Sequence, residues 1–316
     1  MRLQVVSIHL TLTFLYSAVS AQEASRTGFF ERPDTTVPAR MVALSAGTVA
    51  VSAGSMLVLN EYWYKGFPRR RFHFYNDGGE WLQMDKAGHV FTTYFFSKYS
   101  RELWRWTGLP RKKQIWYGGL SGLAYQSVIE VLDGGSANWG FSWSDMAANA
   151  IGAAAMVGQE LLWDEQRIQL KFSWSPVRYT DPVLHRRADD IYGVNTLERI
   201  LKDYNGQTYW ASLNLSSFFP HKKLPKWLNI SFGYGVDGVY DAYENMWDTQ
   251  EGNHTDYRHI RRVRQFYLSP DIDLTRIPTR RKGIKVLLQA LNMIKIPAPA
   301  LEINSAGRLR AHAFHF

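Results

Sequence analysis

Apolar residues follow two different periods along the chain, and the change lies near residue 167. Before it, apolar segments are long and rich in glycine, alanine and serine. The segment 41–60 has no charged side chain over 20 residues, which is long enough to cross a bilayer. Its small side chains favour close packing against other helices. Three more segments with helical spacing predict a four-helix bundle, with Ser142 or Ser144 capping the last one: 85–106, 114–132 and 145–163.

After residue 167 apolar and polar residues alternate, which predicts strands with one apolar face each. A terminal Phe316 on the last strand is typical of outer-membrane barrels. We count roughly six strands, fewer than the eight of the smallest such barrels, so a small barrel and an open antiparallel sheet both stay possible. The fold class is therefore α+β. A helix is expected over 283–294, and the alternation is clearest in 168–174, 209–215, 228–236, 266–274 and 309–316.

The N-terminus resembles a targeting segment. Arg2 precedes an apolar stretch over 5–16, and Val19-Ser20-Ala21 places small residues at the positions that signal peptidase requires. An uncleaved membrane anchor is the alternative. The predicted organisation is a signal peptide at 1–21, a flexible segment at 22–38, a helical module at 39–166 and an antiparallel β module at 167–316.

Composition narrows the class of protein. The absence of cysteine excludes disulfides, thiolate metal sites and a lipidated N-terminal cysteine. A mean hydropathy of −0.28 argues against an all-helical inner-membrane protein. An exported chain without cysteine predicts a bacterial cell-envelope protein, in the outer membrane or in a membrane facing the periplasm. With net charge +9, its basic clusters favour anionic lipid headgroups or a solvated face, and nucleic acid is not expected.

Polar pairs at helical spacing lie in the three later helical segments. Buried unpaired charges are costly, so these groups are expected to meet and pair. Three interpretations remain open: a structural cluster that fixes helix register, a site for a lipid or glycan headgroup, and a metal site. The pairs are Asp85 with His89, Glu130 with Asp133, and Asp145 with Asn149, and Lys86 lies beside the first.

In the headgroup interpretation, His89 and a carboxylate act as acid and base. The catalytic candidates are then His89, Asp85, Glu130 and Asp145, and the binding candidates are Lys86, Asp133 and Asn149. The metal interpretation uses Asp85, His89, Glu130 and Asp133 as ligands. Because Lys86 would compete with a metal cation, we assign no metal, and we expect no cofactor.

Three motifs in order resemble the YfiM-like family of predicted periplasmic or envelope lipoproteins, whose function is not settled. The motifs are similar, more distantly, to VanZ-like membrane proteins, which carry Glu followed by Gln where this chain has Glu130 and Asp133. The resemblance covers about 80–160 and implies the seven candidate residues as family positions, without supplying a reaction. The chain departs from the family by lacking the lipoprotein cysteine and by its β-type half. The motifs are Asp85-Lys86-x-x-His89, Glu130-x-x-Asp133 and Phe141-Ser-Trp-Ser-Asp145-x-x-Ala148-Asn149-x-x-Gly152.

These observations predict a membrane-associated envelope protein that binds membrane lipid or an envelope glycan. The alternative is an enzyme that acts on a lipid or glycan headgroup through its histidine and carboxylates. Whether the protein is an enzyme stays open, and the sequence does not indicate an oligomeric state.

Overall fold

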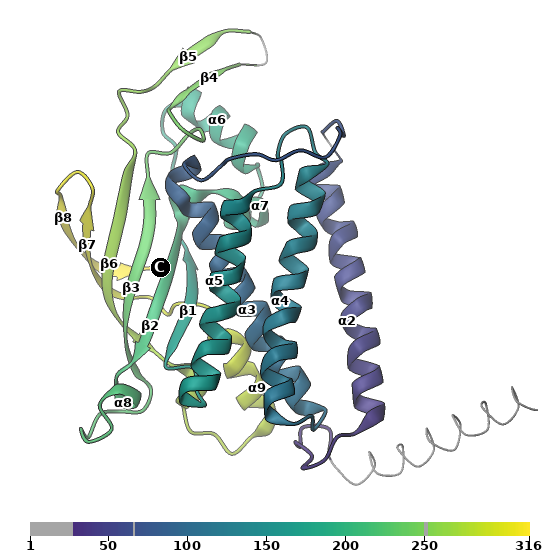
Figure 1. Ribbon diagram of the computed structural model, residues 1–316. Coiled ribbons are helices and arrows are strands. Elements are labelled where there is room, and N and C mark those ends of the chain that lie inside the picture. Colours follow the sequence, from purple (N-terminus) through teal and green to yellow (C-terminus); the bar gives the residue numbers. More distant parts are fainter. Residues whose placement is uncertain (1–27, 66, 250–251) are drawn as a thin grey trace, which may run out of the picture.

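The computed structural model describes residues 28–316 except 66, 250 and 251, so the predicted signal peptide at 1–21 lies outside the described residues. The helices predicted before residue 167 are confirmed and run alongside one another (Figure 1). They are α2 (Pro38–Leu59), α3 (Met84–Trp106), α4 (Arg111–Gly134) and α5 (Trp143–Trp163).

Capping and small side chains explain how these helices begin and pack. The Ser142 hydroxyl accepts a hydrogen bond from the backbone N–H of Asp145 at 3.0 Å, which confirms the predicted cap of α5. α3 packs against both α4 and α5 through glycines. A Cβ on Gly122 would lie 2.8 Å from the backbone nitrogen of Ser97, and one on Gly152 would lie 2.3 Å from the carbonyl oxygen of Val90. Only glycine permits this approach.

The C-terminal half contains an open six-stranded antiparallel sheet in the order β1-β2-β3-β6-β7-β8. The α+β class is therefore confirmed, and the small-barrel alternative gives way to a sheet whose ends do not join. β7 had no predicted counterpart, and β4 pairs only with β5. The strands are β1 (Ile168–Trp174), β2 (Gln207–Asn214), β3 (Leu228–Asp237), β4 (Met246–Asp248), β5 (His254–Asp256), β6 (Val263–Ile272), β7 (Ala298–Asn304) and β8 (Leu309–His315).

Short helices connect these strands. α9 (Lys282–Leu291) confirms the helix expected near 283–294. Helices α6 (Pro182–Tyr192) and α7 (Thr196–Lys202) were not predicted, although Asp181 and Asn195 cap them in the usual way. The remaining helical turns are Asn60–Tyr64, Glu80–Gln83, Tyr204–Gly206, α8 (Leu215–Phe218) and Leu274–Arg276.

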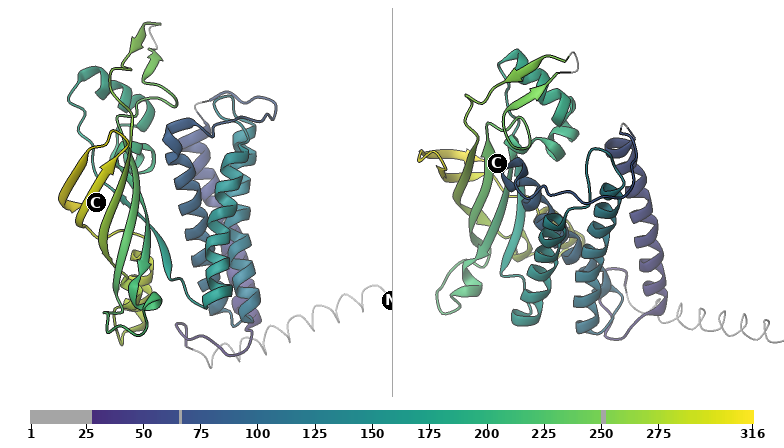
Figure 2. Two further views of the ribbon diagram at one scale, coloured as in Figure 1. Left: turned by 60° about the vertical axis from the view of Figure 1, so that its left-hand side comes forward. Right: turned by 45° about the horizontal axis from the view of Figure 1, so that its top comes forward.

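The sheet and the bundle form two layers that lie side by side (Figure 2). α3 packs against strands β1 and β2 of the sheet. Its Phe91 ring lies 5.9 Å from Phe172 of β1 and 5.7 Å from Tyr209 of β2, between ring centroids. α2 lies on the side of the bundle away from the sheet (Figure 1). The described part of the segment expected to be flexible, residues 28–37, is bonded to the end of α3 through the Val37 N–H and the Thr107 carbonyl.

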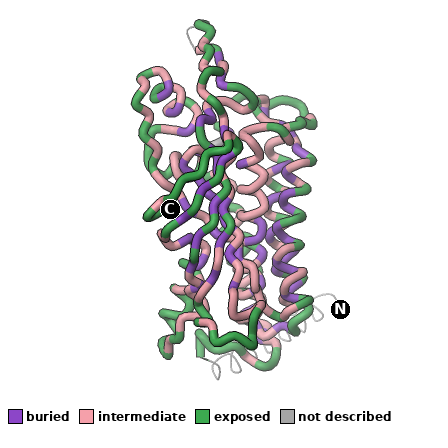
Figure 3. Tube along the Cα trace, turned by 90° about the vertical axis from the view of Figure 1, so that its left-hand side faces the viewer, coloured by how far each residue is buried: buried purple, intermediate pink, exposed green. Residues whose placement is uncertain are grey.

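The sheet buries its polar face and exposes most of its apolar face. On β6, Ser269 and Asp271 are buried while Phe266 and Leu268 are exposed, and buried and exposed residues alternate along the strands (Figure 3). The polar face is concave, since Nζ of Lys171 on β1 lies 2.7 Å from Oδ2 of Asp271. In water, a sheet with one covered face normally buries its apolar side and exposes its polar side.

The outer surface of the bundle is also apolar. α2 is the one helix among the described residues with the length and composition to cross a membrane, and none of its apolar window is buried. α4 and α5 continue this surface. Its exposed side chains include Val42, Val49, Val51, Leu57 and Val58 of α2, Leu120, Val128 and Val131 of α4, and Ile151, Leu161 and Leu162 of α5.

Candidate functional site

Polar side chains gather at one end of the bundle, where α3 and α5 begin and α4 ends. We call this group the lysine–carboxylate cluster. The structure brings six of the seven predicted residues into one network of direct contacts and adds an aspartate from the loop before α3. The cluster consists of Asp77, Asp85, Lys86, His89, Glu130, Asp145 and Asn149.

Lys86 lies at the centre of the carboxylates. Its ammonium nitrogen is 2.7 Å from a carboxylate oxygen of each of Asp77, Asp85 and Asp145, and its side chain is 13% exposed. One cation therefore serves three acids. The oxygens of these three aspartates lie close enough to hold a metal ion, but the lysine ammonium already contacts all three.

Asp77 is the member that sequence reasoning missed. It accepts hydrogen bonds from the hydroxyls of Ser142 at 2.5 Å and Ser144 at 2.7 Å. Burial alone would raise the pKa of Asp77, but hydrogen bonds with Asp145, Lys86 and the two serines outweigh it and lower the pKa to about 2. Asp77 is therefore a fixed negative charge that holds Lys86 in place. It lies in a loop, where no helical period marked it.

His89 lies between two carboxylates. Its Nδ1 is 3.0 Å from Oδ1 of Asn149 and 3.5 Å from Oε1 of Glu130, and its Nε2 is 3.7 Å from Oδ1 of Asp145. The imidazole is 21% exposed, against 1% for Glu130 and 9% for Asp145. It is thus the most accessible of the three, with an acid against each ring nitrogen. This arrangement can pass a proton between a ligand and a buried carboxylate.

Several buried polar atoms around His89 lack hydrogen-bond partners within the described part of the chain: Oε1 of Glu130, Nδ2 of Asn149 and Oε1 of Gln126. Each such atom costs about 1–3 kcal/mol. The same region is otherwise well bonded, since the Thr93 hydroxyl donates to Asn149 at 3.0 Å. Unpaired atoms that surround one accessible histidine suit a site that completes its bonds with a ligand, a proton or ordered water.

Asp133 lies to the side of the network. Its carboxylate accepts a hydrogen bond from the Tyr64 hydroxyl at 2.7 Å, and no direct contact between Asp133 and His89 or Lys86 occurs among the described residues. The predicted metal set of Asp85, His89, Glu130 and Asp133 is therefore not the one that the fold assembles. The compact sets are His89–Glu130–Asp145 and Asp77–Asp85–Asp145, each with ligand atoms within 4.8 Å.

The sequence carried partial signals for most of the side chains that surround the cluster. Gln126 precedes Glu130 by one helical turn, and Ser142 and Ser144 belong to the recognised capping stretch. Thr93 follows His89 by one turn. No sequence pattern marked Tyr64 as a neighbour of the site. It ends a short π-helical turn that follows a helix without any other polar site residue.

Residues 73–159 match a family model described as a predicted periplasmic lipoprotein (DUF2279). This segment contains the whole lysine–carboxylate cluster and covers α3, α4 and most of α5. The match agrees with the prediction of an uncharacterised cell-envelope protein from a family of periplasmic lipoproteins. The more specific YfiM-like and VanZ-like assignments remain predictions. Searches of curated proteins and of solved structures gave no match.

Proposed function

We propose that this chain is an integral protein of a bacterial envelope membrane and that it binds lipid or other envelope constituents at the membrane surface. The observation that carries the proposal is the reversed burial of the sheet. Phe232, Phe266, Leu301 and Ile303 are exposed on its outer face while its concave face is polar. An exposed apolar face of this kind is stable when hydrocarbon, not water, covers it.

The lengths of helices and strands support this environment. α2 has 22 residues, which corresponds to about 33 Å at 1.5 Å per residue. β3 and β6 have 10 residues each, which is the length of a tilted strand that crosses a bilayer. Helical and strand layers thus match the same hydrocarbon thickness of about 30 Å.

Aromatic side chains lie near both ends of this apolar surface. Trp143 and Phe74 are exposed and stack at the end that holds the lysine–carboxylate cluster, with ring centroids 6.0 Å apart. Trp116 near the start of α4 and Trp227 before β3 are exposed at the other end. Aromatic residues at these two levels are typical of proteins that cross a membrane.

Membrane insertion also accounts for the missing lipoprotein cysteine. The matched family is described as lipoproteins, whereas this chain contains no cysteine to lipidate. The exposed apolar surfaces of α2 and the sheet would supply the attachment that a lipid anchor supplies elsewhere.

Single-cysteine labelling tests the proposal cleanly because the natural chain has no cysteine. Val49→Cys and Phe266→Cys place a fluorophore on the two apolar surfaces, and His254→Cys places it on the exposed β4–β5 hairpin. In vesicles containing brominated lipid, we expect strong quenching at the first two positions and little at the third. Equal quenching at all three positions would contradict membrane insertion.

A second function is favoured by His89: an enzyme that acts on a lipid or glycan headgroup. The cluster lies within about one and a half turns of the helix ends, which is roughly 8 Å, and therefore close to the level of headgroups. His89→Ala tests this function, because an enzyme loses turnover while the bundle keeps its fold.

A further inference from the structure

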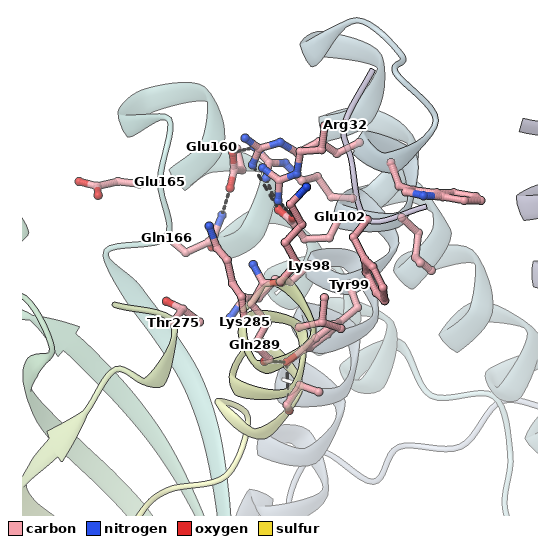
Figure 4. Close-up of a pocket in the computed structure, with 18 of the residues that line it drawn as sticks. Arg32, Lys98, Tyr99, Glu102, Glu160, Glu165, Gln166, Thr275, Lys285 and Gln289 are labelled. Atoms are coloured by element: carbon pink, nitrogen blue, oxygen red, sulfur yellow. Dashed lines mark hydrogen bonds and ion pairs between the residues drawn. The ribbon is translucent and has the colours of Figure 1, made fainter. Parts of the chain in front are cut away.

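A cavity of about 1100 Å³ opens at the other end of the bundle. We call it the basal pocket. It lies between residues 98–106 of α3, residues 160–169, helix α9 and the segment 29–32, and Figure 4 shows side chains of α3 and of α9 facing it. It shares no residue with the lysine–carboxylate cluster.

The lining of the basal pocket is positively charged. Lysine and arginine side chains outnumber aspartate and glutamate by seven to five. One carboxylate, Glu102, contacts three guanidinium groups: Arg32 at 2.8 Å, Arg105 at 3.7 Å and Arg101. The acids in the pocket therefore leave a positive excess on its wall.

Two of the cations have no acidic partner among the residues that the structure describes. Nζ of Lys98 is bonded to the side-chain oxygen of Gln169 at 2.6 Å, which is a neutral acceptor. Lys285 on α9 is exposed and forms no ion pair within the same described residues. A half-buried ammonium next to an open cavity is the kind of group that an anionic ligand completes.

Apolar side chains lie beside this charge. Phe30, Leu103 and Val286 line the pocket and are each about half exposed. α9 is strongly amphipathic, with Val286 and Leu287 exposed, as in helices that lie at a membrane surface. Its far end is held by the Tyr99 hydroxyl, which donates to the carbonyl of Ala290 at 3.2 Å.

We propose that the basal pocket binds an anionic glycerophospholipid, with the phosphate near Lys98 and Lys285 and the acyl chains along the apolar rim. A ligand with charge alone would leave the rim exposed, and one without charge would leave the cations uncompensated. This inference rests on the proposed function, since a lipid reaches the pocket only where this end of the bundle lies at a membrane surface.

Native mass spectrometry of the full chain in detergent, titrated with phosphatidylglycerol or phosphatidylcholine of equal acyl length, tests the inference. We expect phosphatidylglycerol to bind at least tenfold more tightly than phosphatidylcholine. Lys98→Gln and Lys285→Gln should each weaken phosphatidylglycerol binding about fivefold, as expected for about 1 kcal/mol per cation. Because Lys285 is exposed on α9, Lys285→Gln should fold normally, so weaker binding by this variant cannot be attributed to misfolding. The matched control is Lys112→Gln, a lysine at the same end but outside the pocket.

Unchanged phosphatidylglycerol binding in both pocket variants overturns the inference, and so does an equal loss in Lys112→Gln. Inorganic phosphate that displaces the lipid at equal concentration would assign the pocket to free phosphate and overturn the lipid. These outcomes are distinct from failure of the proposed function, which the quenching experiment reports independently: a chain quenched at Val49 and Phe266 but indifferent to Lys98→Gln keeps the membrane and loses only the pocket.

Discussion

Two buried groups of charges lie inside the apolar surface of this protein, and they differ in how far they are closed off from the surface. In the sheet interior, Lys171 and Asp271 form an ion pair at 2.7 Å with both side chains 0% exposed. The same lysine donates to the Ile272 carbonyl at 2.7 Å, and Ser212 donates to Asp271 at 2.5 Å. The lysine–carboxylate cluster is 13% exposed at Lys86 and leaves polar atoms of Glu130 and Asn149 unpaired within the described chain.

The difference separates a structural charge group from a functional one. The Lys171–Asp271 pair is out of reach of a ligand because neither side chain is exposed, although Oδ1 of Asp271 also lacks a hydrogen-bond partner within the described chain. We therefore expect the pair to fix the curvature of the sheet. A partly open group with unpaired atoms gives up stability and keeps binding capacity, as functional sites commonly do. We therefore expect that replacing Lys171 mainly lowers stability and that replacing Lys86 mainly impairs function.

The largest effect is expected at the sealed pair. Lys171→Met leaves Asp271 buried with Lys295 as its remaining cation, at 3.8 Å, and breaking such a pair costs about 3–5 kcal/mol. The free energy of unfolding in detergent, followed by tryptophan fluorescence, should fall by that amount. Lys86→Met should cost less, because its carboxylates are partly exposed and can take up protons. A larger loss for Lys86→Met than for Lys171→Met would contradict the comparison.

The double variant Lys171→Met with Asp271→Asn is the control for this prediction. It removes both charges together, so it should recover part of the lost stability. No recovery would mean that Lys171 stabilises the sheet through its bond to the Ile272 carbonyl and not through the ion pair.

The next largest effect is expected on the exposed apolar face of the sheet. Leu268→Lys places a charge on the outer face of β6, opposite Phe232 in the register with β3. In a bilayer this should destabilise the fold by about 2–4 kcal/mol, measured by denaturant unfolding in vesicles. His254→Lys on the exposed β4–β5 hairpin should change little. Equal, small effects of both substitutions would mean that water, not lipid, covers the sheet.

A smaller effect is expected where α3 and α5 hold the cluster together. A Cβ on Gly152 would meet the Val90 carbonyl at 2.3 Å, whereas one on Gly158 in the same helix meets nothing within 4 Å. Gly152→Ala should lower the free energy of unfolding by about 1–3 kcal/mol. Gly158→Ala should be neutral or stabilise by up to about 1 kcal/mol. Equal effects would place the helix contact elsewhere than at Gly152.

Part of the lysine–carboxylate cluster and most of the strands could be predicted from the sequence. Helical spacing located Asp85, His89 and Asn149, because side chains four residues apart share a helix face. It could not give the central position of Lys86, which depends on a loop aspartate, Asp77, that no period marks. Alternation gave most strands, yet not which face is inside. Lys171 and Phe172 are adjacent, and only the curvature of the assembled sheet decides that the lysine is buried.

The smallest stability change, and the most informative one, is expected for His89→Ala. Truncation removes the bond to Asn149 at 3.0 Å, which is worth about 1 kcal/mol, from a side chain that is partly exposed. The protein should still insert and keep its unfolding free energy within about that amount, while a strain that carries only this variant loses the envelope phenotype of the parent gene. His185→Ala, an exposed histidine paired to Asp189 at 3.5 Å, is the matched control and should complement fully. If His89→Ala complements as well as His185→Ala, the cluster is structural like the sheet interior. A loss above about 3 kcal/mol, the size expected for a sealed ion pair, would lead to the same conclusion.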